Sequence, residues 1–203
     1  MDQKHPAHDA DTIAFYDREA AVYAARRQPK RHPRLDAFIQ HVGAGAKVLE
    51  LGCGGGQDAE VMLAAGLDVT LTDASTGLAM QAEQRVGRPV RIMRFDELDE
   101  SEAYAGVWAN ACLLHVPSAA MPDVLGRIWR ALKPGGALYA SFKAGEGDDR
   151  DSLGRFYNFP PRPVLEGFFA ASAPWASLTI TEDKSGGGYD GVPRNWLLCA
   201  VVK

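Results

Sequence analysis

The amino-acid sequence predicts an α/β fold built on an open, doubly wound sheet. Short apolar runs alternate with helical patterns of about ten residues, which is typical of βαβ units and of a mostly parallel sheet with helices on both faces. Because crossovers between parallel strands are right-handed, few other topologies remain. The C-terminal part differs, since two strand-like runs joined by a glycine-rich segment predict an antiparallel hairpin there.

The expected elements follow one another along the chain. Helical patterns over residues 12–23 and 35–42 come first, and the second ends at Gly43, as helices commonly do. Five strands are then expected, at residues 47–51, 67–72, 90–95, 107–114 and 137–142. The remaining helices are expected at residues 57–65, 74–85, 121–132 and 164–171, and the hairpin strands at 178–182 and 196–202.

Three segments are expected to form no regular element. Residues up to about Asp11 are polar without periodicity and should fray. The basic run from Arg26 to Arg34 contains two prolines, which break a helix, and is expected to be a solvated face. Residues 143–163 are rich in Gly, Asp, Arg and Pro, and a loop of this length is usually functional or disordered.

Length and composition limit the class of protein. A chain of 203 residues with 46% hydrophobic and 24% charged residues is globular, and its net charge of −4 argues against a nucleic-acid binder. Cys53, Cys112 and Cys199 are too few for a disulfide framework or a zinc site, so no metal is expected. The acidic first residues and the lack of an apolar run of about 18 residues exclude a signal peptide and a membrane span. We expect a cytoplasmic protein; nothing marks an oligomer interface.

A glycine-rich turn and three acids stand at successive strand ends. Residues 52–56 (GCGGG) follow the first strand, and such a turn brings bare backbone and a helix N-terminus against a ligand. Glu50 precedes the turn and suits a ligand with a cationic end. Asp73 ends the second strand, where a carboxylate can accept hydrogen bonds from ribose hydroxyls, and Asp96 ends the third, where it can bond an adenine amine.

Other nucleotide sites fit this turn less well. It contains no lysine, which argues against a P-loop. Gln57 stands where a dinucleotide fingerprint needs its third glycine, which counts against a nicotinamide-dependent enzyme. Taken singly, each motif is also compatible with an ordinary turn or a surface acid.

Four motifs carry a resemblance to a known family. Residues 48–56 (VLELGCGGG) closely resemble motif I of the class I S-adenosylmethionine-dependent methyltransferases. The resemblance continues through residues 72–75 (TDAS), 110–116 (NACLLHV) and 131–136 (ALKPGG), in the family's order and spacing. Among these enzymes the chain looks like the small stand-alone methyltransferases grouped with quinone biosynthesis and tellurite resistance. The resemblance implies a Rossmann-like sheet of seven strands whose last strand is antiparallel.

The resemblance also implies a cofactor site for S-adenosylmethionine. Glu50, Gly52 and Gly54 would border its methionine portion, and the backbone of residues 110–113 would lie beside the reactive methyl. In many relatives an N-terminal helix closes over the cofactor, which adds Tyr16, Tyr23 and Arg27 as candidate contacts. The expected cofactor-binding residues are Glu50, Gly52, Cys53, Gly54, Asp73, Ala74, Asp96, Glu97, Asn110, Ala111, Cys112, Tyr16 and Tyr23.

The expected reaction is methyl transfer from S-adenosylmethionine to a small-molecule acceptor. Alignment of the reactants is the main task, and positioning contributes on the order of 7–11 kcal/mol in well-oriented reactions. His115 is a candidate base, or else a loop histidine bonded to backbone. Lysine, arginine and aromatic residues after the fifth strand suit a negatively charged molecule. The expected substrate-binding residues are His115, Lys143, Arg150, Arg155, Tyr157 and Arg194.

We expect one domain over residues 1–203. It comprises N-terminal helices that form a cap (1–45), a cofactor-binding core (46–142), a substrate loop (143–163), and a C-terminal helix and hairpin (164–203). Two alternatives remain open at this point: an NAD(P)-dependent oxidoreductase, and a module that binds S-adenosylmethionine without catalysis.

Overall fold

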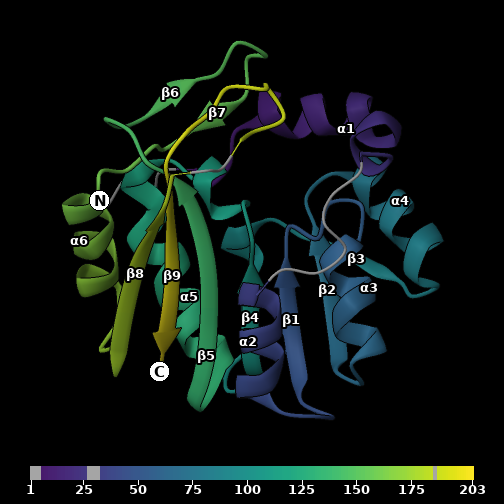
Figure 1. Ribbon diagram of the computed structural model, residues 1–203, viewed down its shortest axis with the longest axis vertical. Helices are drawn as coiled ribbons and strands as arrows, with labels where there is room; N and C mark the ends of the chain where they lie inside the picture. Colours follow the sequence, from purple (N-terminus) through teal and green to yellow (C-terminus); the bar gives the residue numbers. More distant parts are fainter. Residues whose placement is uncertain (1–5, 27–32, 185–186) are drawn as a thin grey trace.

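A computed structural model of the protein describes residues 6–26, 33–184 and 187–203 and is organised around a seven-stranded sheet (Figure 1). The strand order is β3-β2-β1-β4-β5-β9-β8. The strands are β1 (Lys47–Leu51), β2 (Asp68–Asp73), β3 (Val90–Ile92), β4 (Tyr104–Ala109), β5 (Leu132–Lys143), β8 (Ser177–Asp183) and β9 (Trp196–Val202). Neighbouring strands from β3 to β5 are parallel, whereas β9 runs antiparallel to both β5 and β8. The predicted Rossmann-like sheet and its C-terminal hairpin are confirmed.

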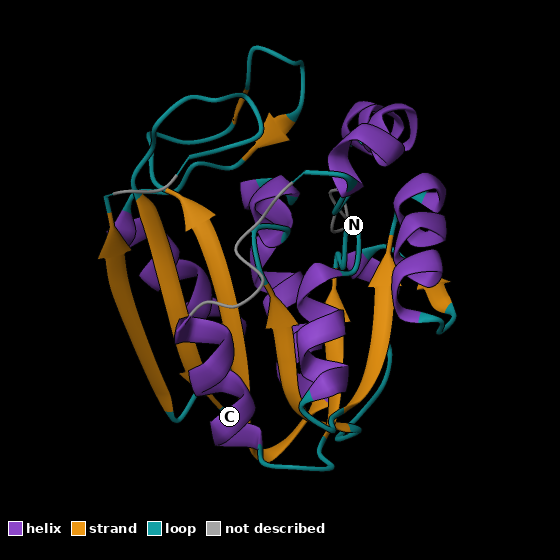
Figure 2. Ribbon diagram, turned by 45° about the vertical axis from the view of Figure 1, so that its right-hand side comes forward, coloured by secondary structure: helices purple, strands orange, loops and turns teal. Residues whose placement is uncertain are grey.

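Helices cover both faces of the sheet. They are α1 (Ala10–Ala24), α2 (Pro33–Val42), α3 (Gln57–Ala64), α4 (Thr76–Val86), α5 (Met121–Ala131) and α6 (Arg162–Ser172). One apolar core lies under α2, α3 and α4, and the other lies under α5 and α6. Because successive side chains of a strand point to opposite faces, Val48 joins the first core and Leu49 the second. Helix α1 packs on α4 and lies at the carboxyl ends of the strands (Figure 2).

Several predicted strand boundaries are wrong. Strand β3 ends at Ile92, because the Arg94 N–H and guanidinium bond the Glu97 carboxylate and turn residues 95–97 into a short 3-10 helix, η1 (Phe95–Glu97). Strand β4 begins at Tyr104 and ends at Ala109, because Ala111 has a φ of 54°, outside extended geometry. A second 3-10 helix, η2 (Leu113–His115), follows.

The segment after β5 is more ordered than expected. It contains a two-stranded hairpin, β6 (Asp149–Arg150) and β7 (Phe156–Tyr157), so the expectation that residues 143–163 form no element is wrong. The polar side chains of Asp151, Arg155 and Asn158 are buried there. Arg155 pairs with Asp151, and the Asn158 amide nitrogen donates to the Leu113 and Val116 carbonyls, contacts that composition alone does not reveal.

The N-terminus is also more ordered than expected where the structure describes it. Ala7 is buried, and Asp9 caps α1 by accepting a hydrogen bond from the Thr12 N–H at 2.9 Å. The central part of the expected basic run, residues 27–32, lies outside the described residues, as does Gly186 of the expected hairpin turn. None of the described helices is long and apolar enough to cross a membrane.

Candidate active site

The turn after β1 is closely packed on two sides. Gly52, Gly54 and Gly56 have φ values of 60°, 55° and 78°, a region that favours glycine. A Cβ on Gly52 would lie 2.5 Å from the Cβ of Cys112, which follows β4. The bare backbone of the turn therefore lies directly against the loop after β4 at Gly52.

Asp73 ties this turn to the end of β2. Its carboxylate is buried and accepts hydrogen bonds from the backbone N–H groups of Gly54 and Ser75, each at 2.9 Å. Burial raises the pKa of Asp73 to about 6, although these two hydrogen bonds favour the charged form. Glu50 is buried behind the turn, and burial raises its pKa well above the usual value. Its Oε2 has no hydrogen-bond partner among the described residues.

Helix α1 covers the glycine turn. The Asp17 carboxylate accepts hydrogen bonds from the Ser75 hydroxyl (2.7 Å) and the Gly77 N–H (2.9 Å), which fasten α1 to α4. A cavity of about 90 Å³ lies beneath the helix, and we call it the acidic cavity after Asp73. It is lined by Thr12, Ile13, Tyr16, Tyr23, Gly52, Gly54, Asp73, Ala74, Ser75, Leu78, Phe95, Ala111, Cys112 and His115.

A larger cavity of about 360 Å³ adjoins the acidic cavity. Tyr16, Tyr23, Ala111 and His115 line both, so the two spaces share a wall. We call the larger one the basic cavity, because four cations line it together with aromatic side chains. Those cations are Arg26, Arg34, Lys143 and Arg155, and the further aromatic residues are Tyr157, Tyr189 and Trp196.

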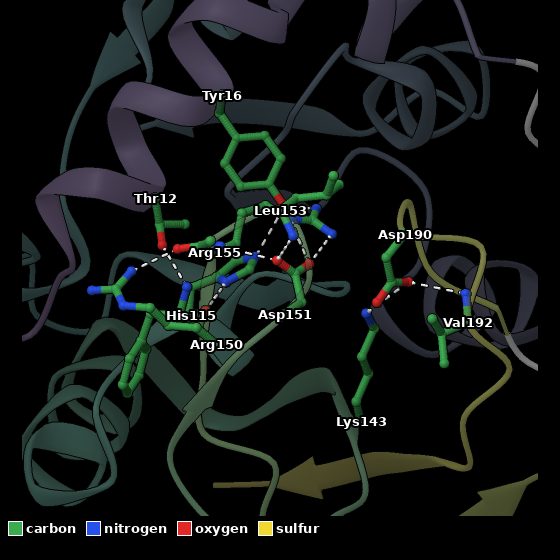
Figure 3. Close-up of polar contacts among 12 residues, drawn as sticks. Thr12, Tyr16, His115, Lys143, Arg150, Asp151, Leu153, Arg155, Asp190 and Val192 are labelled. Carbon is green, nitrogen blue, oxygen red and sulfur yellow. Dashed lines mark hydrogen bonds and ion pairs between the residues drawn. The ribbon is translucent and has the colours of Figure 1, made fainter.

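A chain of polar contacts forms the shared wall (Figure 3). Arg155 pairs with Asp151 at 2.5 Å and donates a hydrogen bond from Nη1 to the Tyr16 hydroxyl at 2.9 Å. The Tyr16 hydroxyl lies 3.0 Å from His115 Nε2, and His115 Nδ1 lies 2.6 Å from the Phe156 carbonyl oxygen. Since a carbonyl oxygen only accepts, Nδ1 carries the proton and Nε2 accepts from Tyr16.

The His115 side chain is therefore neutral, and its ring nitrogens are engaged in hydrogen bonds. Burial, together with the nearby Arg155 and Lys143 charges, lowers its pKa to about 4. Both ring nitrogens already have partners within the protein. This arrangement matches the alternative of a loop histidine bonded to backbone more closely than that of a free base.

Lys143 reaches the basic cavity from the end of β5. Its side chain is only 2% exposed, and Nζ has no hydrogen-bond partner among the described residues. The nearest carboxylate oxygen is Asp190 Oδ1 at 3.8 Å, and Nζ lies 4.3 Å from the centre of the Tyr157 ring. Burial lowers the pKa of Lys143 to about 8, against the opposing effect of Asp190.

A separate polar network shapes the turn after β4. Asn110 donates from Nδ2 to Asp58 at 3.1 Å, and its Oδ1 accepts from the Ser141 hydroxyl at 2.9 Å. The same hydroxyl accepts the Ala111 N–H at 2.8 Å. The strained backbone of Ala111 is thus held in place by β5.

The structure gathers most, but not all, of the expected cofactor residues at the acidic cavity. Asn110 lines the basic cavity instead, and Glu50 and Cys53 are buried behind the turn. Asp96 and Glu97 lie on η1, where both pair with Arg94. The residues that do line the acidic cavity are Tyr16, Tyr23, Gly52, Gly54, Asp73, Ala74, Ala111 and Cys112.

The expected substrate residues divide in the same way. His115, Lys143, Arg155 and Tyr157 line the basic cavity. Arg150 is exposed and pairs with Asp9 at 2.7 Å. Arg194 stacks on the Phe159 ring, 4.5 Å from its centre, and does not line the cavity.

Sequence reasoning missed several lining residues. Ser75 could have been predicted as a lining residue, because it belongs to the TDAS motif. Thr12 and Ile13 could have been predicted too, because they lie on the predicted first helix. Phe95 was placed in a strand. Tyr189 lies in the glycine-rich connection before β9, where no periodic signal marks it.

The comparisons agree with this geometry. Residues 48–136 match a family described as a methyltransferase domain. Together with the fold and the glycine turn, this match confirms the predicted resemblance to the class I S-adenosylmethionine-dependent methyltransferases.

Two curated relatives are similar to this chain over part of their length. The ubiquinone biosynthesis O-methyltransferase of Xanthomonas oryzae pv. oryzae is 33% identical over 105 residues, which are 48% of this chain and 43% of the relative. That of Xylella fastidiosa is 32% identical over 117 residues, 53% of this chain and 46% of the relative. The chain thus spans less than half the length of these curated relatives.

Solved structures show the same fold. The 1,6-didemethyltoxoflavin-N1-methyltransferase of Burkholderia thailandensis has a TM-score of 0.73 and 23% sequence identity to this chain. The match covers 96% of this chain and 86% of that enzyme's chain. The phosphoethanolamine N-methyltransferase 2 of Haemonchus contortus has a TM-score of 0.70 and 18% sequence identity to this chain. The match covers 94% of this chain and 56% of that enzyme's chain.

Proposed function

We propose that this chain transfers the methyl group of S-adenosylmethionine to a small-molecule acceptor held in the basic cavity. The observation that carries the proposal is the contact between two cavities of different character through Tyr16, Tyr23, Ala111 and His115. One carries the family's glycine turn and Asp73, and the other is large enough for a small molecule. Relatives named for ubiquinone biosynthesis, 1,6-didemethyltoxoflavin and phosphoethanolamine support a small acceptor.

The acidic side fits the cofactor chemically. S-adenosylmethionine supplies an electrophilic methyl on a sulfonium when it is bound. Asp73 keeps lone pairs for ribose hydroxyls beyond its two backbone contacts, and the buried Glu50 Oε2 is without a partner. Two buried carboxylates beside the turn favour a ligand with cationic groups over a pyrophosphate.

The protein's own part in the reaction is positioning and exclusion of water. Helix α1 closes the acidic cavity through Asp17, and the Asn110–Ser141 network fixes the turn between the two cavities. A junction held by such hydrogen bonds can align an acceptor with an electrophile.

The remaining assignments belong to the same proposal. Asp96, Glu97, Cys53 and Asn110 stay candidate cofactor residues at the strand ends, and residues 143–163 form the substrate loop of one domain. A cytoplasmic location is supported by the free state of the three cysteines, Cys53, Cys112 and Cys199. Arg150 and Arg194 act on the acceptor through the segments that they hold, since neither lines the basic cavity.

Transfer of a labelled methyl group tests the proposal. The purified protein is incubated with methyl-labelled S-adenosylmethionine and a panel of small phenols, carboxylic acids and amines, and labelled product is separated from the cofactor. We expect at least one acceptor class to be labelled. Tight binding of S-adenosylhomocysteine without labelling of any acceptor would indicate a binding module without catalysis.

A further inference from the structure

Lys143 is placed in an unusual way. It is a buried cation without a hydrogen-bond partner among the described residues, and it faces a cavity that the protein does not fill. Gly188 makes room for it, because a Cβ at that position would lie 2.5 Å from Nζ. Retaining an unsatisfied ammonium group costs free energy, which points to a ligand atom as the missing partner.

Lys143 and the turn after β4 face the same space. Ser141 and Lys143 are two residues apart on β5, so their side chains point to the same face of the sheet, about 7 Å apart along the strand. Ser141 holds the backbone of Ala111, and Ala111 lines both cavities. A small molecule in the basic cavity therefore lies between Nζ and the turn that borders the cofactor side.

The other lining groups are poor proton acceptors. Both nitrogens of His115 are engaged, and Asp183 pairs with Arg34 at 3.2 Å. Burial raises the pKa values of Tyr16 and Tyr157, so both remain protonated phenols. Among the described residues that line this cavity, Lys143 is the group best placed to take a proton.

We propose that Lys143 is a catalytic residue of the proposed methyl transfer, on which this inference rests: its Nζ takes the proton from an acidic acceptor hydroxyl. The acceptor oxygen then forms a bond to the methyl carbon, and the carbon–sulfur bond breaks with its electron pair going to sulfur. The products are the methyl ether, S-adenosylhomocysteine and a Lys143 ammonium, which later releases the proton to water.

The charges around Lys143 suit this step. Asp190, on the connection before β9, stabilises the ammonium that forms. Arg155 and Arg194 lower the pKa of Lys143, so its amine is partly neutral near pH 8. Asp151 and the Tyr157 phenol also face the amine. The cations of the cavity stabilise a deprotonated oxygen, so the acceptor class is a small compound with an acidic hydroxyl.

Binding of 4-nitrophenol to the protein loaded with S-adenosylhomocysteine tests the contact without turnover. Ionisation of this probe is visible by its absorbance. We expect the wild type to bind it as the phenolate at a pH where the free probe is mostly protonated. Lys143→Met should weaken that signal at least tenfold while leaving S-adenosylhomocysteine affinity within twofold. An unchanged phenolate signal in Lys143→Met would overturn the proposal.

Kinetics separate a base from a simple cation anchor. For an acceptor that the protein methylates, we expect kcat to rise with pH through about 8, and Asp190→Asn to move this rise to lower pH. Gly188→Ala should displace Lys143 and lower kcat, whereas Lys133→Met, at the exposed start of the same strand, serves as the control. Lys143→Arg should fail to restore kcat, because its guanidinium stays protonated. Restoration by arginine would overturn the base role.

The two proposals fail differently. If no acceptor is methylated but the phenolate signal depends on Lys143, the proposed function fails and the acidic-hydroxyl site stands. If methyl transfer occurs with equal kcat in Lys143→Met, the proposed function stands and the role of Lys143 is wrong.

Discussion

The acidic and basic cavities share a wall but carry opposite charge. Asp73 lines the first, and no lysine or arginine does among the described residues. Arg34, Lys143 and Arg155 line the second, and its one described carboxylate, Asp183, is already paired with Arg34. Under the proposed function, this difference lets one site hold a cationic donor and an acidic acceptor side by side, each in a field that favours it.

The wall between them is itself a structural element. Arg155 belongs to the hairpin after β5, Tyr16 to α1 and His115 to η2, so three distant segments meet in one hydrogen-bonded chain. Such a network is strong only when every member is satisfied. Breaking one side or the other should therefore separate stability from cofactor binding.

The largest effect is expected from Arg155→Met. This change leaves the Asp151 carboxylate buried without its cation and removes a donor from the Tyr16 hydroxyl. We expect the free energy of unfolding to fall by about 3–5 kcal/mol, measured by urea denaturation. Arg162→Met breaks an exposed pair with Glu166 and should cost less than about 1 kcal/mol. Equal losses in the two variants would mean that the wall is not a stabilising network.

On the acidic side, Asp73→Ala should remove cofactor binding. The carboxylate is expected to accept two ribose hydroxyls, and hydrogen bonds to a charged group contribute about 1.5–3 kcal/mol each, so affinity for S-adenosylhomocysteine should fall about 100-fold or more. Asp68→Ala, at the exposed start of the same strand, is the matched control. Calorimetric titration of both folded variants measures the difference. Unchanged affinity in Asp73→Ala would refute the ribose assignment.

The contributions of His115 and Asp73 to the free energy of unfolding should change with pH in opposite directions. The pKa of His115 is lowered from 6.5 to about 4, so the unfolded chain binds more protons in this window and His115 adds stability as pH rises through it. The pKa of Asp73 is raised from 3.8 to about 6, so its contribution to stability falls as pH rises through that window.

Stability curves of two variants separate these contributions. The difference in unfolding free energy between wild type and His115→Gln should grow from pH 4 to 6.5, and the difference from Asp73→Asn should shrink from pH 3.8 to 6. Chemical denaturation at several pH values measures both. Curves that run parallel to that of the wild type would contradict the assigned shifts.

The smallest effect is expected at Arg150. Its side chain is 43% exposed and pairs with Asp9 at the start of α1, outside both cavities. Arg150→Ala should leave both the free energy of unfolding and the affinity for S-adenosylhomocysteine close to those of the wild type, because an exposed ion pair is screened by solvent. A tenfold loss of affinity in this variant would show that the cover over the acidic cavity depends on this pair.

The acidic cavity could be predicted from sequence because its parts are local. The glycine turn follows β1 and Asp73 ends β2, both strands are visible as apolar runs, and parallel strands bring their carboxyl ends together. Asp96 shows the limit of this reasoning. The chain leaves the sheet three residues before the predicted end of β3, because Arg94 binds both acids of the following turn.

The basic cavity could be predicted only in part. Lys143, Arg155 and Tyr157 were expected near the acceptor from composition and position after the fifth strand. The burial of Arg155 was not foreseeable, since its partner Tyr16 is 139 residues away and no periodic pattern marks the segment. Tyr189 was missed for the same reason, because only the folded hairpin brings it over the cavity.

Calorimetric titration with S-adenosylhomocysteine, NAD and NADP tests the assignment of the acidic cavity most directly. We expect the wild type to bind S-adenosylhomocysteine and neither nicotinamide nucleotide, and Asp73→Ala to lose that binding. Binding of NAD or NADP in place of S-adenosylhomocysteine would contradict the assignment, because a pyrophosphate would then occupy a cavity bounded by buried carboxylates.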